Sequence, residues 1–144
     1  MESERHILDD IDVKILELLR KDGRMSFIDI GKKVGLSEGA VRRRVKLLQE
    51  RGIIKKFTIE IDRSYGVSAV TFIQLEPGSS PKQVVEKVAN IPGVEVVYEI
   101  TGRFDVIAIL SAPSIGELNE RIDMIRDIEG IRETETAVIL RVIK

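Results

Sequence analysis

Residues 68–144 repeat one order of elements, strand, helix, strand, and this repeat restricts the fold more than any other feature of the sequence. The two copies contain matching segments, NIPGVEVV and DIEGIRET, with Gly93 and Gly130 in equivalent places. Apolar patterning and helix caps predict strands at 68–75, 94–100, 105–111 and 134–143 and helices at 80–89 and 114–126. The fold class we expect is α+β, with a ferredoxin-like βαββαβ domain whose two helices lie on one face of a four-stranded antiparallel sheet.

The strand at 105–111 is apolar on both sides. Val106, Ala108 and Leu110 lie on one face, and Ile107 and Ile109 lie on the other. Helices on one side of a sheet cover one face only, so the second apolar face needs another partner. The simplest partner is the same sheet of a second chain, which predicts a two-fold homodimer. The alternative is that the N-terminal domain folds back over the sheet.

The first 52 residues follow the helical period instead of the strand period. Asp9 or Asp10, Ser26 and Ser37 are placed to cap three successive helices, and a tight turn containing glycine separates the second helix from the third. A short helix, such a turn and a longer helix predict a helix-turn-helix domain, winged-helix-like, over residues 1–52. In domains of this type the longer helix enters the major groove of DNA.

The third predicted helix lies in the most basic part of the chain. Residues 32–56 hold nine Lys or Arg and two Asp or Glu, although the net charge of the whole chain is −1. On the helix, Val41, Val45 and Leu48 share an apolar stripe, so the basic residues opposite them face outward. This arrangement predicts a polyanionic partner, double-stranded DNA. For the charge run alone, a solvated helix face is the alternative.

The residues expected to contact DNA are Ser37, Gly39, Arg42, Arg43, Lys46, Lys55 and Lys56. Gly39 lets the backbone approach a phosphate or a base edge closely. Arginine can bond guanine with two hydrogen bonds, and it can equally hold a phosphate. The sequence leaves open which of Arg42, Arg43 and Lys46 reads bases. Arg44 lies at the margin of the apolar stripe, where we expect it to pair with an acidic residue of the first helix.

Residues 53–67 join the two predicted domains. The segment IIKKFTIEID, residues 53–62, alternates in the manner of a strand, and RSYGV, residues 63–67, has the composition of a joint. We therefore expect a strand-bearing hinge between the domain at 1–52 and the domain at 68–144.

Composition excludes several kinds of site. There is no cysteine and one histidine, His6, so the chain offers no disulfide, no thiolate nucleophile and no Cys/His metal site. We expect His6 to be solvated, and we expect no metal and no cofactor. No apolar run approaches the roughly 18 residues of a membrane span, and the acidic N-terminus is unlike a signal peptide, which favours a cytoplasmic protein. Without a Ser/His or Cys/His set, an enzyme of amino-acid metabolism is disfavoured.

Over essentially its whole length the sequence resembles the Lrp/AsnC family of transcriptional regulators. The resemblance rests on the order and spacing of three segments, LDDIDVKILELLRKDGRMSFIDIGKKVGLSEGAVRRRVKLLQERGIIK, TGRFDVI and GIRETETAVILRVIK. It implies a sequence-specific regulator whose C-terminal domain forms dimers and often tetramers or octamers. It also implies a small effector, commonly an amino acid, bound between subunits of neighbouring dimers. The alternative is an architectural protein that binds DNA with little sequence preference and has no effector.

The family pattern of a glycine, two intervening residues and an aspartate falls on Gly102 and Asp105. An α-amino acid presents an ammonium group, which a carboxylate such as Asp105 can bind, and a carboxylate, which backbone N–H groups near Gly102 can bind. By resemblance the effector residues are Tyr98, Thr101, Gly102, Arg103, Phe104, Asp105, Thr134 and Thr136. Arg103 stands where many relatives carry an acidic or another polar residue, which alters the expected effector preference or removes the response to free amino acids. The alternative is that Gly102 and Asp105 are only turn residues.

Overall fold

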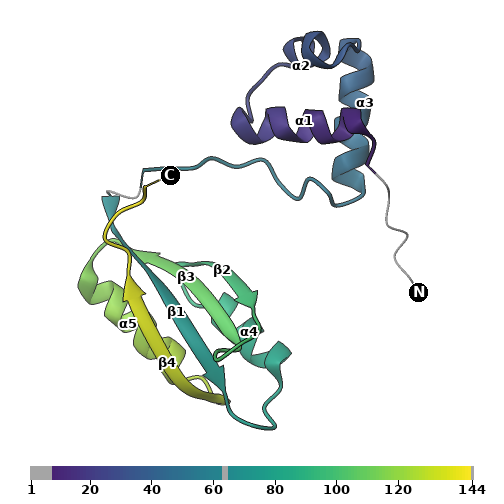
Figure 1. Cartoon of the computed structure of the whole chain (residues 1–144). Helices are drawn as coiled ribbons and strands as arrows, with labels where there is room; N and C mark the ends of the chain where they lie inside the picture. Colours follow the sequence, from purple (N-terminus) through teal and green to yellow (C-terminus); the bar gives the residue numbers. More distant parts are fainter. Residues whose placement is uncertain (1–7, 63–64, 144) are drawn as a thin grey trace. The chain divides into compact units, whose positions relative to one another are not determined.

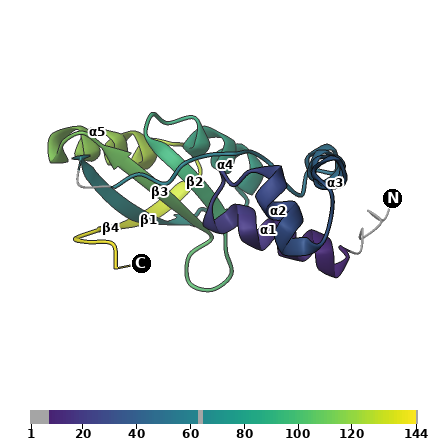
Figure 2. The same ribbon diagram turned by 90° about the horizontal axis from the view of Figure 1, so that it is seen from above.

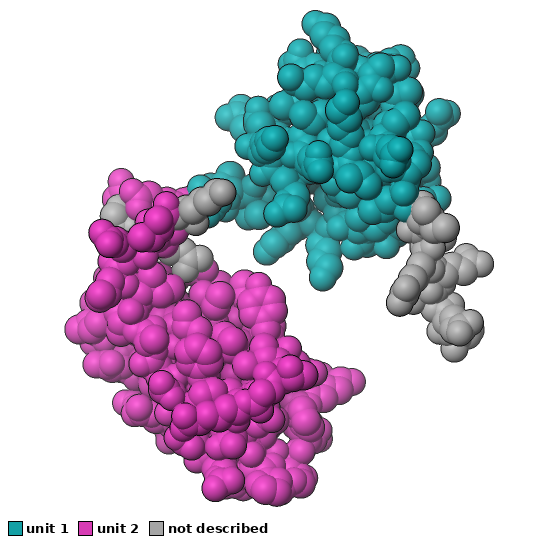
Figure 3. Space-filling view, in the orientation of Figure 1, with its two compact units in different colours: residues 1–60 teal, residues 61–144 magenta. Residues whose placement is uncertain are grey.

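The computed structural model describes residues 8–62 and 65–143 of the 144-residue chain. The chain forms two compact units, residues 1–60 and residues 61–144 (Figures 1 and 3). Each unit has its own hydrophobic core. His6 and the linker residues Arg63 and Ser64 lie outside the described residues.

The first unit contains three helices, α1 (Asp10–Lys21), α2 (Phe27–Val34) and α3 (Glu38–Glu50) (Figure 1). Each begins at a residue whose side chain accepts a hydrogen bond from the first turn. The Asp12 N–H donates to Asp9 at 2.7 Å, and Ser26 and Ser37 cap α2 and α3 in the same way. These caps confirm the three helix starts that the sequence predicts.

The three helices share one core, formed by Ile15, Ile30, Val41, Val45 and Leu48. All five side chains are buried, so one stripe of α3 is fixed against α1 and α2. Between α2 and α3 the chain turns at Gly35, which has a left-handed φ of 73°, a conformation that glycine adopts without strain. The helix-turn-helix arrangement predicted from the sequence is therefore present.

Arg44 joins the third helix to the start of the first. Its Nη1 lies 2.6 Å from Oδ2 of Asp9 and 2.8 Å from Oδ1 of Asp12. The expected pairing of Arg44 with the first helix is confirmed. The Asp12 backbone N–H, followed by the Arg44 guanidinium, lowers the pKa of Asp9 below its usual value.

The strand expected within residues 53–62 is not present. Ile53 and Ile54 pack against the core of the first unit, and residues 55–62 have no regular secondary structure. A strand needs a neighbour for its ladder of hydrogen bonds, and no strand in the described ranges pairs with this segment. Its apolar side chains are exposed, Ile59 to 79%. Alternation alone was therefore not sufficient to predict a strand here.

The second unit is built on a four-stranded antiparallel sheet in the order β2-β3-β1-β4. The elements follow the chain as β1 (Val67–Leu75), α4 (Pro81–Ala89), β2 (Val94–Glu99), β3 (Val106–Ala112), α5 (Ile115–Arg126) and β4 (Ile131–Val138). Gly93 and Gly130, at the equivalent places of the sequence repeat, have positive φ angles of 83° and 95°. The order and the pairing confirm the ferredoxin-like βαββαβ fold.

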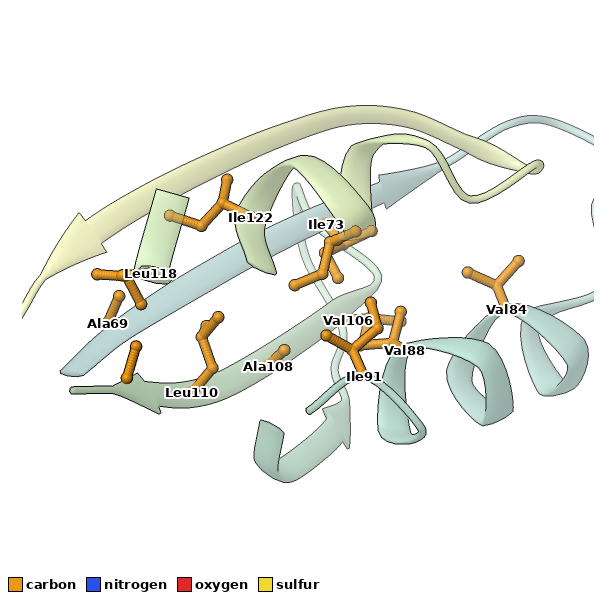
Figure 4. Close-up of a cluster of buried hydrophobic side chains, with 12 residues drawn as sticks. Ala69, Ile73, Val84, Val88, Ile91, Val106, Ala108, Leu110, Leu118 and Ile122 are labelled. Atoms are coloured by element: carbon orange, nitrogen blue, oxygen red, sulfur yellow. The ribbon is translucent and has the colours of Figure 1, made fainter. Parts of the chain in front are cut away.

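Both helices pack on the same face of this sheet (Figures 2 and 4). Val88 of α4 and Leu118 of α5 contact a core that includes Ile73 of β1 and Leu110 of β3. Val106, Ala108 and Leu110 face this core, as the alternation predicts. None of the helices in the described ranges has the length and apolarity that a membrane span requires.

The opposite face of the sheet is apolar across the middle of β1, β2 and β3, and neither α4 nor α5 covers it. On β4, Glu135 lies on this face, opposite Phe72. Cross-strand pairing sets Phe72 against Ile107 and Val70 against Ile109, and Tyr98 lies on the other side of Ile107. Tyr98 is 52% exposed. These six side chains, Val70, Phe72, Val96, Tyr98, Ile107 and Ile109, are called the open sheet face below.

The last strand begins earlier and ends earlier than the predicted range 134–143. It starts at Ile131 and ends at Val138, after which one hydrogen bond, from the Ile139 N–H to the Ser68 carbonyl at 2.8 Å, continues the pairing. The register sets Val138 opposite Ala69, so β1 has only two residues left to pair beyond that point. The apolar residues that follow, such as Leu140, are exposed for lack of a neighbouring strand.

We predict that Gly31→Ala destabilises the first unit. A Cβ at Gly31 would press against the carbonyl group of Leu36, which is backbone of the turn and cannot move aside freely. We expect a loss of roughly 1–3 kcal/mol in the free energy of unfolding, measured by urea titration with circular dichroism at 222 nm. The matched control is Gly39→Ala, because a Cβ there meets nothing within 4 Å. Equal stability of the two variants would contradict the prediction.

A second prediction concerns acid stability. Because the pKa of Asp9 is lowered in the folded chain, its carboxylate adds stability above the ordinary pKa near 3.8, and this stability is lost as the pH falls through the folded pKa. Asp9→Asn keeps a capping oxygen but removes the charge opposite Arg44. We expect the variant to be less stable than the wild type at pH 7 and to lose less stability on acidification to pH 3. Asp10→Asn is the control. If the stability of the two variants changed with pH in the same way, the assignment of this pH-dependent stability to Asp9 would be contradicted.

Candidate functional site

The outward side of α3 carries the predicted DNA-contacting residues. Val41, Val45 and Leu48 are turned into the core, and Gly39, Arg42, Arg43 and Lys46 are exposed. The Ser37 hydroxyl, at the start of the helix, accepts a hydrogen bond from the Ala40 N–H at 3.2 Å, which leaves its own proton available for donation. The structure thus brings five of the seven predicted residues onto one helix and its cap.

The basic side chains on α3 differ in their contacts. Arg42 pairs with Glu38, Nη2 to Oε1 at 2.5 Å, and its guanidinium lies 5.2 Å from the ring centre of Phe27. Lys46 is 3.8 Å from Glu50. Within the described ranges, the guanidinium of Arg43 makes no ion pair or hydrogen bond. Arg42 and Lys46 are therefore each paired with a glutamate of the same helix, whereas Arg43 is not.

Lys55 and Lys56 lie just beyond the first unit's packed residues. Ile53 and Ile54 donate backbone hydrogen bonds to the Leu48 carbonyl, at 2.9 and 3.0 Å, and so anchor the chain to the end of α3. The two lysines that follow are exposed. They add positive charge next to the helix-turn-helix unit, on a segment without regular secondary structure.

The predicted effector turn lies between β2 and β3. Gly102 has φ 114°, which a residue with a side chain rarely adopts. The Asp105 carboxylate accepts a hydrogen bond from the Leu75 N–H at 2.8 Å, and the Asp105 N–H donates to the Ile73 carbonyl at 2.9 Å. Asp105 therefore ties the start of β3 to the end of β1 and has a structural function whatever else it binds.

An open hollow of about 470 Å³ lies beside Asp105, at the edge where β1 and β2 end and β3 begins. Its lining residues are Gln74, Leu75, Glu76, Pro77, Ser79, Pro81, Glu99, Ile100, Asp105, Val106 and Arg132. Only Asp105 among them was identified from the sequence. The others meet because of strand register, a long-range property that the sequence alone did not reveal.

The remaining predicted effector residues fall elsewhere in this unit. By register Thr134 and Thr136 lie on the helix side of β4, where Thr136 shares a 2.9 Å hydrogen bond with Thr71. Tyr98 belongs to the open sheet face. Thr101 and Gly102 are exposed in the turn, outside the lining of the hollow. Within one chain the structure does not gather these residues around Asp105.

Arg103 and Phe104 form a small cluster of their own. The Arg103 guanidinium lies 5.1 Å from the ring centre of Phe104 and 3.9 Å from Glu133. The Phe104 ring in turn lies 5.4 Å from that of Phe72 on the open sheet face. In the described part of the chain, no group of three or more His, Cys, Asp or Glu side chains is arranged to hold a metal ion.

Two family models match the sequence. The AsnC-type helix-turn-helix domain matches residues 8–49, and the Lrp/AsnC ligand binding domain matches residues 68–144. A similar protein is the HTH-type transcriptional regulator LysM of Saccharolobus solfataricus, which is 41% identical over 134 residues, 93% of this chain and 94% of that protein.

Solved structures agree with this match. The leucine response regulatory protein LrpA of Mycobacterium tuberculosis has a TM-score of 0.82 at 28% identity and covers 95% of each chain. A transcriptional regulator of Neisseria meningitidis, solved as a complex with L-Met, shares the fold with a TM-score of 0.82 at 22% identity, covering 96% of this chain and 93% of that one. Both domains match one family, and relatives of the chain are named regulators and not enzymes. The chain therefore belongs to the Lrp/AsnC family and is a transcriptional regulator with a helix-turn-helix domain and a ligand-binding domain.

Proposed function

We propose that this chain is a sequence-specific regulator that binds double-stranded DNA through α3, in the cytoplasm, and responds to an amino acid. The observation that carries the proposal is the division of α3 into a buried apolar stripe and an exposed basic side. Arg42, Arg43 and Lys46 engage the DNA from this side, and Ser37 and Gly39 let the start of the helix approach it closely. Lys55 and Lys56 add phosphate contacts.

The open sheet face supports a homodimer. Six neighbouring apolar side chains on one face of an otherwise covered sheet expose a surface that water solvates poorly. Pairing this face with the same face of a second chain gives a two-fold interface, and two recognition helices are then presented to half-sites about one turn of DNA apart. Further association into tetramers or octamers lets one particle hold several sites.

The turn at Gly102 and the hollow beside Asp105 support an effector site. The Asp105 carboxylate is suited to the ammonium group of an α-amino acid, and turn N–H groups near Gly102 to its carboxylate. Thr134 and Thr136 of a neighbouring subunit complete the site in the assembly. The match to a ligand-binding domain and the L-Met complex of a protein with the same fold support an amino acid as the effector. The effector acts only to the extent that it binds one arrangement of subunits better than another.

The DNA-binding part is tested by a double substitution on α3. Arg42→Ala with Arg43→Ala should weaken binding to the DNA upstream of the chain's own gene by about tenfold or more, because two DNA-contacting cations are lost. Binding is measured by fluorescence anisotropy at one salt concentration, with a scrambled fragment alongside. Lys82→Ala with Lys87→Ala on α4 is the control, since it removes the same charge outside the helix-turn-helix unit. If both variants lost the same DNA affinity, the proposed interface on α3 would be contradicted. If the wild type bound the upstream and the scrambled fragments equally well, the architectural alternative would be favoured.

The effector site is tested with Asp105→Asn. The amide keeps an oxygen for the Leu75 N–H but removes the charge that an ammonium group requires. We expect DNA binding by the variant to resemble that of the wild type, while any change of affinity caused by the twenty amino acids, tested one at a time, is lost. Asp127→Asn at the end of α5 is the charge-matched control. A response retained by Asp105→Asn would remove this residue from the site.

A further inference from the structure

Arg42 and Arg43 are adjacent in the sequence, but in the structure their side chains differ in direction and in contacts. We infer that Arg43 is the arginine that reads a base in the major groove, and that Arg42 holds the DNA backbone and the geometry of the motif. This inference rests on the proposed DNA-binding function and adds the residue that determines specificity.

Direction on the helix is the first argument. With about 100° between successive residues, Arg43 lies roughly 170° from the centre of the stripe formed by Val41, Val45 and Leu48, whereas Arg42 lies roughly 90° from it. These three residues are buried. A side chain opposite the core points directly away from the unit. Arg43 is therefore directed into whatever groove α3 enters, and Arg42 is directed to its flank.

Arg42 lies on the side of α3 that is next to the start of α2. The guanidinium lies 5.2 Å from the ring centre of Phe27, the first residue of α2, and pairs with Glu38 at the start of α3. In helix-turn-helix proteins the first helix of the motif crosses the sugar-phosphate backbone. A cation held at the N-terminus of that helix is placed for a phosphate, and its bond to Glu38 reduces the charge that it offers.

Gly39 supplies the space that Arg43 needs. Long side chains on a helix point back toward the N-terminus and cover the residue four positions earlier, as the bond between Arg42 and Glu38 shows directly. By the same rule Arg43 can reach over Gly39. A Cβ at Gly39 would meet nothing within 4 Å, so the place over this glycine is open. The planar guanidinium can lie there with its donors directed at the O6 and N7 of a guanine.

The test is a binding-site selection from a random DNA library with four full-length proteins, the wild type and the variants Arg43→Lys, Arg43→Ala and Arg42→Ala. We expect the wild type to select a symmetric consensus that includes a guanine in each half-site. Arg43→Ala should lose the preference at that one position, since alanine has no donor, and Arg43→Lys should weaken it, since an ammonium lacks the rigid planar pair of donors that fits O6 and N7. Arg42→Ala should select the wild-type consensus with lower affinity.

Affinities at several salt concentrations complete the test. Arg43→Lys keeps the charge, so its binding to non-consensus DNA should have the salt dependence of the wild type, while its preference for the consensus falls about tenfold. Thermal unfolding midpoints equal to that of the wild type show that each variant is folded. An unchanged consensus for the Arg43 variants, or an altered consensus for Arg42→Ala, overturns the inference and leaves the regulator intact. A wild type that selects no consensus overturns the proposed sequence-specific function itself.

Discussion

The two-sided packing of α3 is the constraint on which the rest of the first unit depends. The helix must bury Val41, Val45 and Leu48 and keep its basic side in solvent. This burial fixes one stripe of α3 against α1 and α2. Arg44 adds a polar link between the helices, because its guanidinium is held by Asp9 and Asp12 at the start of α1. The direction in which the exposed side chains point thus follows from the packing of the buried stripe and from this ion pair at its margin.

In the second unit, two helices cover one face of a four-stranded sheet. The other face is left uncovered and is apolar over β1, β2 and β3. The hollow beside Asp105 arises at the edge of that sheet, where three strand ends meet. The proposed effector site lies at the edge and the proposed dimer surface on the face, so both can be occupied together. In that proposal, binding at one influences the other through the strands that they share, notably β3.

Local signals were sufficient to predict most of this architecture. The caps at Asp9, Ser26 and Ser37 and the repeated glycines at the starts of two strands are short-range features, and each lies where the sequence indicates. The errors occurred where pairing decides the outcome. Residues 55–62 alternate without a neighbour, and the last strand ends at Val138 because β1 ends. The residues around the hollow, such as Arg132, meet only through strand register, so periodicity could not find them.

The open sheet face has a consequence for how such a regulator responds in the cell. In the proposed homodimer, the chain covers its sheet by associating with a second copy, which couples its active form to its own abundance. On this proposal the occupancy of a DNA site rises more steeply than the first power of the protein concentration, so a modest change in synthesis or dilution during growth is amplified at the promoter. The amount of protein is then a second signal, alongside the proposed effector.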